Sequence, residues 1–116
     1  MKKEFVPYKQ ALALKELGFN EPCFGWWFAD EEMLIIDKST KSTSENIIQA
    51  PLFQQAFRWF REKYDLFCWI EKFHKDETYI FQIPPANFTK IQGHFKTYEE
   101  AELACLIKLI EIVKNF

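Results

Sequence analysis

Three cysteines are the strongest nucleophiles in this sequence, and their surroundings favour a structural role. Cys23, Cys68 and Cys105 are each flanked by apolar residues, as in "PCFG", "FCWI" and "ACLI". Thiols in such settings are usually inert members of a core. Their odd number and the lack of a Cys-x-x-Cys pair disfavour a disulfide framework and a zinc ribbon. We therefore expect reduced thiols, as found in cytoplasmic proteins.

The histidines and glycines give no support for catalysis or for a bound cofactor. His74 lies in the polar turn "FHKDE" and His94 follows Gly93 in "IQGHF". A metal site would need both histidines and a carboxylate such as Asp76, yet no ligand spacing supports one. Phosphate-binding loops need several clustered glycines, and the three in this chain are far apart. The acidic stretch "ADEE" is typical of a hairpin turn. We expect no enzyme activity, no metal and no cofactor.

Two basic segments could bind nucleic acid. Arg58 and Arg61 flank Trp59 in "FRWFREKY", and Lys38 and Lys41 lie among hydroxyl residues in "DKSTKSTSEN". Proteins that bind single strands combine basic grooves with aromatic rings on which bases stack. The competing interpretation is an amphipathic helix and a flexible loop. The signature of an RNA-recognition sheet is absent.

The apolar patterning predicts the elements that would position these residues. We expect three helices, over about residues 7–17, 51–64 and 97–115. Proline opens the first two, Gly18 follows the first, and Thr97 with Glu100 forms a capping box for the third. Apolar runs separated by short polar turns predict two hairpins and a fifth strand, over residues 23–37, 66–84 and 87–95.

The fold class that follows is α+β, as a single domain over residues 1–116. The predicted order is α-ββ-α-ββ-(β)-α, with three helices against one antiparallel sheet of four to five strands. Two of the predicted blocks, "PYKQALALKEL" and "PLFQQAFRWFREKY", share a proline and a Gln-Ala pair, which supports an internal duplication only weakly.

Strand alternation divides the aromatic stretch "CFGWWFAD" between two faces. Phe24, Trp26 and Phe28 share one face, which we expect to be core, and Trp27 shares the other with Gly25. An apolar sheet face that helices leave uncovered marks a surface for a partner or for a homodimer. The alternative is that the third helix covers what the first two leave.

Charge and hydropathy limit the environment of the protein. The net charge is −2, from 15 basic and 17 acidic residues, so no global field steers the chain toward nucleic acid. No leader-like segment follows "MKKEF", and no apolar run reaches the length of a membrane span. We expect a cytoplasmic protein that does not contact membranes.

Three stretches carry a resemblance to a known group. "QALALKELGFNEPCFGWW", "APLFQQAFRWFREKY" and "TYEEAELACLIKLIEIV" resemble small uncharacterised proteins of bacterial phages and mobile elements. "CFGWW" departs from the more tyrosine-rich version of that group. The group has no established catalytic motif, so no residue role is inherited. The resemblance implies an inhibitor of a host macromolecule, as anti-CRISPR and other anti-defence proteins are.

The resulting hypothesis is a non-catalytic binding protein, of the anti-CRISPR type, that inhibits a bacterial defence system through contact with a host protein or ribonucleoprotein. The alternative is a small RNA- or DNA-binding module. The candidate binding residues are Trp27, Trp59, Arg58, Arg61, Lys38 and Lys41.

Overall fold

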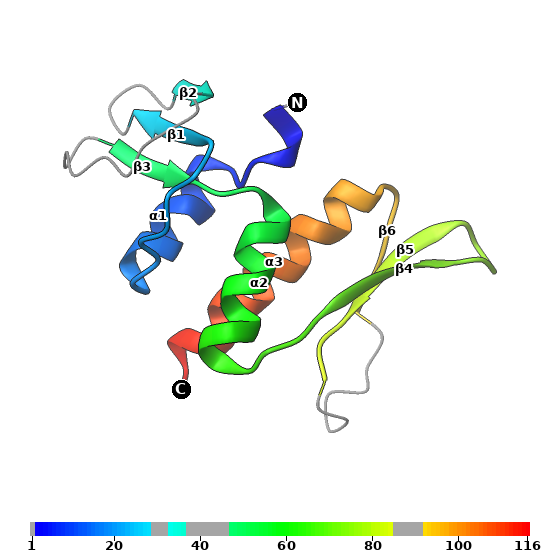
Figure 1. The fold of residues 1–116 in the computed structure, drawn as a ribbon. Helices are drawn as coiled ribbons and strands as arrows, with labels where there is room; N and C mark the ends of the chain where they lie inside the picture. Colours follow the sequence, from blue (N-terminus) through cyan, green and yellow to red (C-terminus); the bar gives the residue numbers. More distant parts are fainter. Residues whose placement is uncertain (1, 29–32, 37–46, 85–91) are drawn as a thin grey trace. The chain divides into compact units, whose positions relative to one another are not determined.

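The computed structural model describes residues 2–28, 33–36, 47–84 and 92–116 (Figure 1). A short 3-10 helix, η1, covers Lys2–Glu4. The α-helices are α1 (Tyr8–Glu16), α2 (Phe53–Tyr64) and α3 (Tyr98–Lys114). The strands are β1 (Gly25–Phe28), β2 (Met33–Ile36), β3 (Ile47–Ala50), β4 (Trp69–Phe73), β5 (Thr78–Gln82) and β6 (Gln92–Phe95).

The α+β class and the three helices are confirmed, whereas the single sheet of four to five strands is wrong. The described strands form two three-stranded antiparallel sheets, ordered β2-β1-β3 and β4-β5-β6. The element order is α-βββ-α-βββ-α, because "IIQA" forms β3, a strand that the apolar patterning does not predict. The chain divides into two compact units, Met1–Ala56 and Phe57–Phe116, each with one sheet. The strand orders of the two sheets differ, which does not favour duplication.

In the first unit, β1 is the central strand and pairs antiparallel with both neighbours. Trp27 lies opposite Leu34 of β2 and Ile48 of β3. Helix α1 packs on this sheet and contacts β3. Just before α1, the Val6 amide donates to the Pro51 carbonyl oxygen at 2.8 Å, which ties the N-terminal segment to the chain that follows β3.

The ends of α1 follow local rules. Pro7 is extended, with φ −62° and ψ 159°, and is the N-cap of the helix rather than part of its first turn. Gly18 has φ +103°, the left-handed conformation that glycine adopts most readily just past a helix end. The stop predicted at Gly18 is therefore confirmed.

Gly25 is required by the packing of β1. A Cβ atom at this position would lie 2.8 Å from a ring carbon of Phe5, which is itself buried. Glycine within a strand often marks such a close approach. The bare backbone at Gly25 therefore lets the N-terminal segment pack against the sheet.

In the second unit, β5 is central and α3 packs against all three strands. The predicted hairpin is confirmed: β4 and β5 pair with Trp69 opposite Gln82 and Phe73 opposite Thr78. Thr97 caps α3, because its hydroxyl accepts a hydrogen bond from the Glu100 amide at 3.1 Å. The apolar side of the helix is buried, at positions Ala101, Cys105, Leu106, Leu109, Ile110 and Val113.

A bulge shapes the pairing of β5 with β6. Tyr79 lies opposite Phe95 and Ile80 opposite Gly93, so His94 is the extra residue of the ladder. Gly93 and His94 have φ values of +119° and +86°. Such bulges re-aim side chains and end regular pairing. Of the predicted strand over residues 87–95, the part before residue 92 lies outside the described residues.

We expect Gly93→Ala to destabilise the second unit by about 1–3 kcal/mol, because L residues rarely adopt this φ. The new Cβ would also fall on the Phe95 ring. Urea denaturation followed by circular dichroism measures the loss. Lys96→Ala, at an exposed position just beyond the strand, is the control and should change stability little. An alanine at position 93 as stable as wild type would contradict the described bulge.

Candidate functional site

Trp27, expected at a surface, is a core residue of the first unit. Its side chain is 6% exposed. The indole N–H donates to the Val6 carbonyl oxygen at 3.1 Å, and the ring meets Tyr8 edge-on. The expectation that Trp27 is exposed is therefore wrong. The residues just before and within α1 approach the Trp27 face of β1, not the opposite face.

Trp59 is buried as well, also at 6% exposure. Its ring packs edge-on against Phe60 and Tyr64, and the Lys63 ammonium lies 5.0 Å from the ring centroid. This burial agrees with the amphipathic-helix interpretation of the segment. The ring is therefore not available as an exposed platform on which a base could stack.

The four basic candidates occupy different settings. Arg58 is exposed on α2, and Arg61 is half-buried one turn further along. Lys38 and Lys41 lie outside the described residues. Of the four, Arg58 is the one that the described residues show to be exposed.

The face of the first sheet that does not receive Trp27 is apolar and only half-buried. Because opposite residues in an antiparallel ladder share a face, the pairing places six side chains together. We call this set the aromatic face: Trp26, Phe28, Met33, Ile35, Ile47 and Gln49.

Apart from the amide of Gln49, the aromatic face carries aromatic and aliphatic groups, and it has no titratable side chain. Trp26 and Phe28 form a T-shaped pair, with ring centroids 4.8 Å apart. Met33, at the outer strand, is 46% exposed, and the other five members are half-buried. A contiguous apolar sheet face of this kind marks an interaction surface. The prediction that Phe24, Trp26 and Phe28 form the core side is wrong, because Phe24 is 60% exposed and Trp26 and Phe28 are half-buried.

Helix α1 leaves the aromatic face uncovered because it packs on the opposite side of the sheet. The buried residues of that opposite side are Gly25, Trp27, Ile48 and Ala50. Phe5 and Tyr8 contact Gly25 and Trp27 there. Figure 1 shows α1 along one side of the β2-β1-β3 sheet. Among the described residues of this unit, no helix covers the other side.

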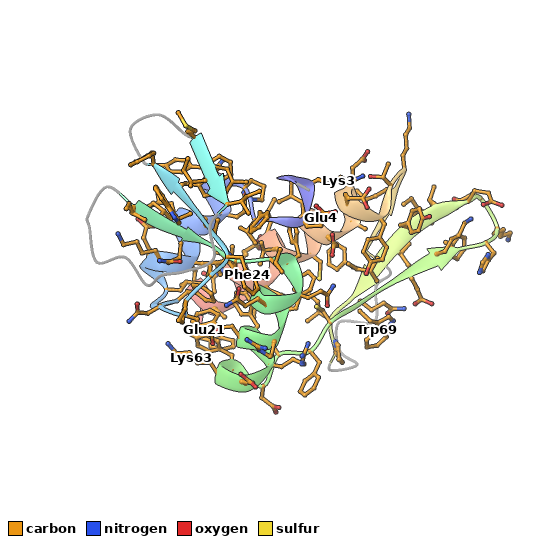
Figure 2. All side chains as sticks on the ribbon, turned by 45° about the horizontal axis from the view of Figure 1, so that its top comes forward. Lys3, Glu4, Glu21, Phe24, Lys63 and Trp69 are labelled. Carbon is orange, nitrogen blue, oxygen red and sulfur yellow. The ribbon has the colours of Figure 1, made fainter. Side chains whose placement is uncertain are left out.

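An exposed tryptophan lies in the β4–β5 hairpin. Trp69 is 48% exposed, and Figure 2 shows its side chain projecting from β4. Its indole N–H donates to a Glu71 carboxylate oxygen at 3.2 Å, and Gln82 donates to the same oxygen at 3.1 Å. The ring is thus held by polar neighbours. The surroundings of Trp69 are therefore more polar than the aromatic face.

His94, Asp76 and Thr78 meet where β6 passes the hairpin turn. His94 Nδ1 is 3.1 Å from Thr78 Oγ1 and 3.3 Å from Asp76 Oδ2. The Thr78 hydroxyl also donates to Asp76, and this bond is the main reason that the pKa of Asp76 is lowered. A catalytic relay needs acid and hydroxyl on different ring nitrogens. Here both meet Nδ1, so the cluster ties β6 to the turn.

Within the described ranges, no group of three or more His, Cys, Asp and Glu side chains could hold a metal ion. In the same part of the chain, no helix is long and apolar enough to cross a membrane.

Comparison with known proteins found no relative. No protein-family model matches the sequence, and neither the curated proteins nor the solved structures gave a significant match. The aromatic face therefore has to be interpreted from its own chemistry.

Proposed function

We propose that this chain is a non-catalytic binding protein that acts by contact with another protein through the aromatic face. The observation that carries the proposal is the difference in burial between the two sides of the first sheet. One side is filled by Trp27 and the segment around α1, while the other presents Trp26 and Phe28 beside an exposed Met33. Protein interfaces are enriched in aromatic residues and methionine, and their centres are depleted of charge.

The lack of charge on the aromatic face favours a protein over a nucleic acid as its partner. Surfaces that bind nucleic acid are strongly basic, because phosphate contacts supply much of the affinity. The aromatic face contains no lysine or arginine. Its chemistry suits an apolar patch on a protein, and does not suit a phosphate backbone. The RNA- or DNA-binding alternative has also lost its stacking residue, because Trp59 is buried.

The specific form that we propose is an inhibitor carried by a phage or mobile element, of the anti-CRISPR type, that blocks a bacterial defence protein or ribonucleoprotein. Its support is the resemblance of "QALALKELGFNEPCFGWW" and the other two stretches to proteins of such elements. Inhibition by steric contact needs an interaction surface and no catalytic group, which agrees with the composition of the aromatic face.

A photo-crosslinking experiment in bacterial cells tests the proposal. Phe28 is replaced by p-benzoylphenylalanine in one variant, and Phe67, an exposed phenylalanine of the second unit, in a matched variant. We expect a discrete adduct with a host protein from position 28 only. Excess wild-type chain should compete the adduct away, and excess Met33→Glu chain should not.

Three outcomes would contradict the proposal. An adduct between two copies of the chain would make the aromatic face a homodimer interface. An adduct with RNA or DNA would favour the nucleic-acid module. An adduct that forms equally from position 67, or that Met33→Glu competes as well as wild type, would place the contact elsewhere.

A further inference from the structure

An indole, a carboxylate and an amide meet on one side of the β4–β5 hairpin. Trp69 lies opposite Gln82 in the ladder and Glu71 is two residues further along β4, so the three side chains share a face. The Trp69 indole N–H donates to Glu71 Oε1 at 3.2 Å, and the Gln82 amide donates to the same oxygen at 3.1 Å. We call these three residues the Trp69 cluster. Neither the aromatic face nor the proposed function uses it.

The Trp69 ring keeps its faces available for a ligand. An indole N–H points outward from the edge of the ring, so its hydrogen bond places Glu71 at this edge and not over a face. The side chain is 48% exposed and projects from β4 (Figure 2). Among the described residues, no second ring and no cation packs against it, in contrast to Trp59, which Lys63 and Tyr64 flank. The face of an indole ring attracts cations.

The carboxylate of Glu71 has hydrogen-bond donors but no counter-charge. Both groups that donate to it are neutral. The neighbouring Lys72 points to the opposite face of the hairpin and forms an ion pair with Glu77, with Nζ and Oε2 2.7 Å apart. In the part of the chain that the structure describes, no lysine, arginine or histidine forms an ion pair with Glu71. The Trp69 cluster therefore presents a negative charge beside an exposed aromatic ring.

The oxygen atoms that remain available in the Trp69 cluster are hydrogen-bond acceptors. The single donor of the indole is used, whereas Glu71 Oε2 and the Gln82 side-chain oxygen have no hydrogen-bond partner within the described ranges. A guanidinium carries five N–H donors and no acceptor, is planar, and stacks on aromatic rings. An ammonium group is a point charge without such a flat surface. The chemistry of the cluster thus favours arginine over lysine, and it disfavours phosphates and other anions.

We propose that the Trp69 cluster is a binding site for an arginine side chain of a partner protein. The guanidinium lies flat against the Trp69 ring and donates to Glu71 Oε2 and to the Gln82 side-chain oxygen. The two hydrogen bonds on Glu71 Oε1 hold the carboxylate and the ring in place before the arginine arrives, which reduces the entropy lost on binding. This site goes beyond the aromatic face, which suits an apolar patch.

An NMR titration of the full chain tests the site. The probe is Nα-acetyl-L-arginine methylamide, and the lysine analogue is the comparison ligand. The ionic strength is kept constant, because salt screens exposed charges. We expect the indole N–H signal of Trp69, assigned with Trp69→Phe, to shift and saturate with arginine, and lysine to bind more weakly. The signals of Trp27 and Trp59, which are buried, should not move.

Glu71→Gln removes the charge of the cluster and keeps the size of the side chain. We expect its Kd for the arginine probe to rise by about threefold, within the range of an exposed ion pair. Glu99→Gln removes the same charge from an exposed position in the first turn of α3, and it should bind the probe like wild type. Because both positions are exposed, both variants should fold.

The wild-type titration decides the proposal even without the variants. The proposal is overturned if the Trp69 signal does not respond to the arginine probe, or if arginine and lysine bind equally. It is also overturned if Glu71→Gln binds as well as Glu99→Gln, or if Trp26 responds in place of Trp69. Because the aromatic face lies in the other unit, failure here leaves the binding proposal standing.

Discussion

Trp27→Ala should lower the free energy of unfolding of the first unit by about 3–5 kcal/mol, the usual range for deleting a buried aromatic side chain. Trp27 is the largest side chain on the buried side of the β2-β1-β3 sheet, and it contacts Tyr8. Its removal also leaves the Val6 carbonyl oxygen without the indole donor. A buried acceptor left unsatisfied costs about 1–3 kcal/mol, which is part of the total loss.

Trp26 offers the matched control, because it is the same residue type one position away on the opposite face. It is half-buried, so Trp26→Ala should cost clearly less than Trp27→Ala. Urea denaturation, read out by hydrogen exchange of the β1 and β3 amides, measures each loss in the first unit. Equal losses, or a larger loss for Trp26, would contradict the assignment of the two faces.

Trp27→Phe separates packing from hydrogen bonding. Phenylalanine keeps most of the ring contact but cannot donate to Val6, so the expected loss is about 1–3 kcal/mol. The result follows from the 3.1 Å bond between the indole N–H and the Val6 oxygen. A phenylalanine variant as unstable as the alanine variant would show that ring contact contributes little.

The sequence predicts which residues of β1 share a face, but it does not predict which face is buried. Both faces are aromatic, so periodicity gives no preference. The choice is made by non-local contacts, in which Phe5 and Tyr8 approach Gly25 and Trp27. One signal was present: a glycine among large residues in a strand indicates close approach of another segment on its own side.

The division into two sheets was missed for a related reason. Ile47–Ala50 is a four-residue segment after a polar stretch, too short for alternation to be read with assurance. Its pairing with the free edge of β1 completes a separate sheet in the first unit. Which edge a strand joins depends on tertiary packing, and local sequence does not encode it.

The ends of the helices are predicted more accurately from the sequence than the site residues are. The Thr97 cap and the glycine after α1 are local features, and both are found as expected. The burial of Trp59 agrees with the amphipathic-helix interpretation of its segment, which conflicts with its choice as a binding residue.

Met33→Glu should weaken binding of the partner by about 30-fold or more, the effect expected at an interface hot spot. Met33 is the most exposed member of the aromatic face. A carboxylate there would be buried without a counter-charge against an apolar partner surface. Because the side chain is nearly half exposed in the free protein, the fold should tolerate the change.

Ile36→Glu is the control for position and exposure. Ile36 lies in the same strand, is 47% exposed against 46% for Met33, and points to the opposite face. Both variants place the same charge on β2, so they should have similar stability. They differ only in the face that carries the charge.

The most direct test of the central claim is the ratio of the two dissociation constants, measured by calorimetry against the host protein crosslinked from position 28. If the aromatic face is the binding surface, the Kd of Met33→Glu should be at least about tenfold above that of Ile36→Glu. This ratio corresponds to a difference in binding free energy of roughly 1.4 kcal/mol. Ile36→Glu should bind almost as well as wild type. Equal constants, or a larger loss for Ile36→Glu, would contradict the claim that this chain binds through Trp26, Phe28 and their neighbours.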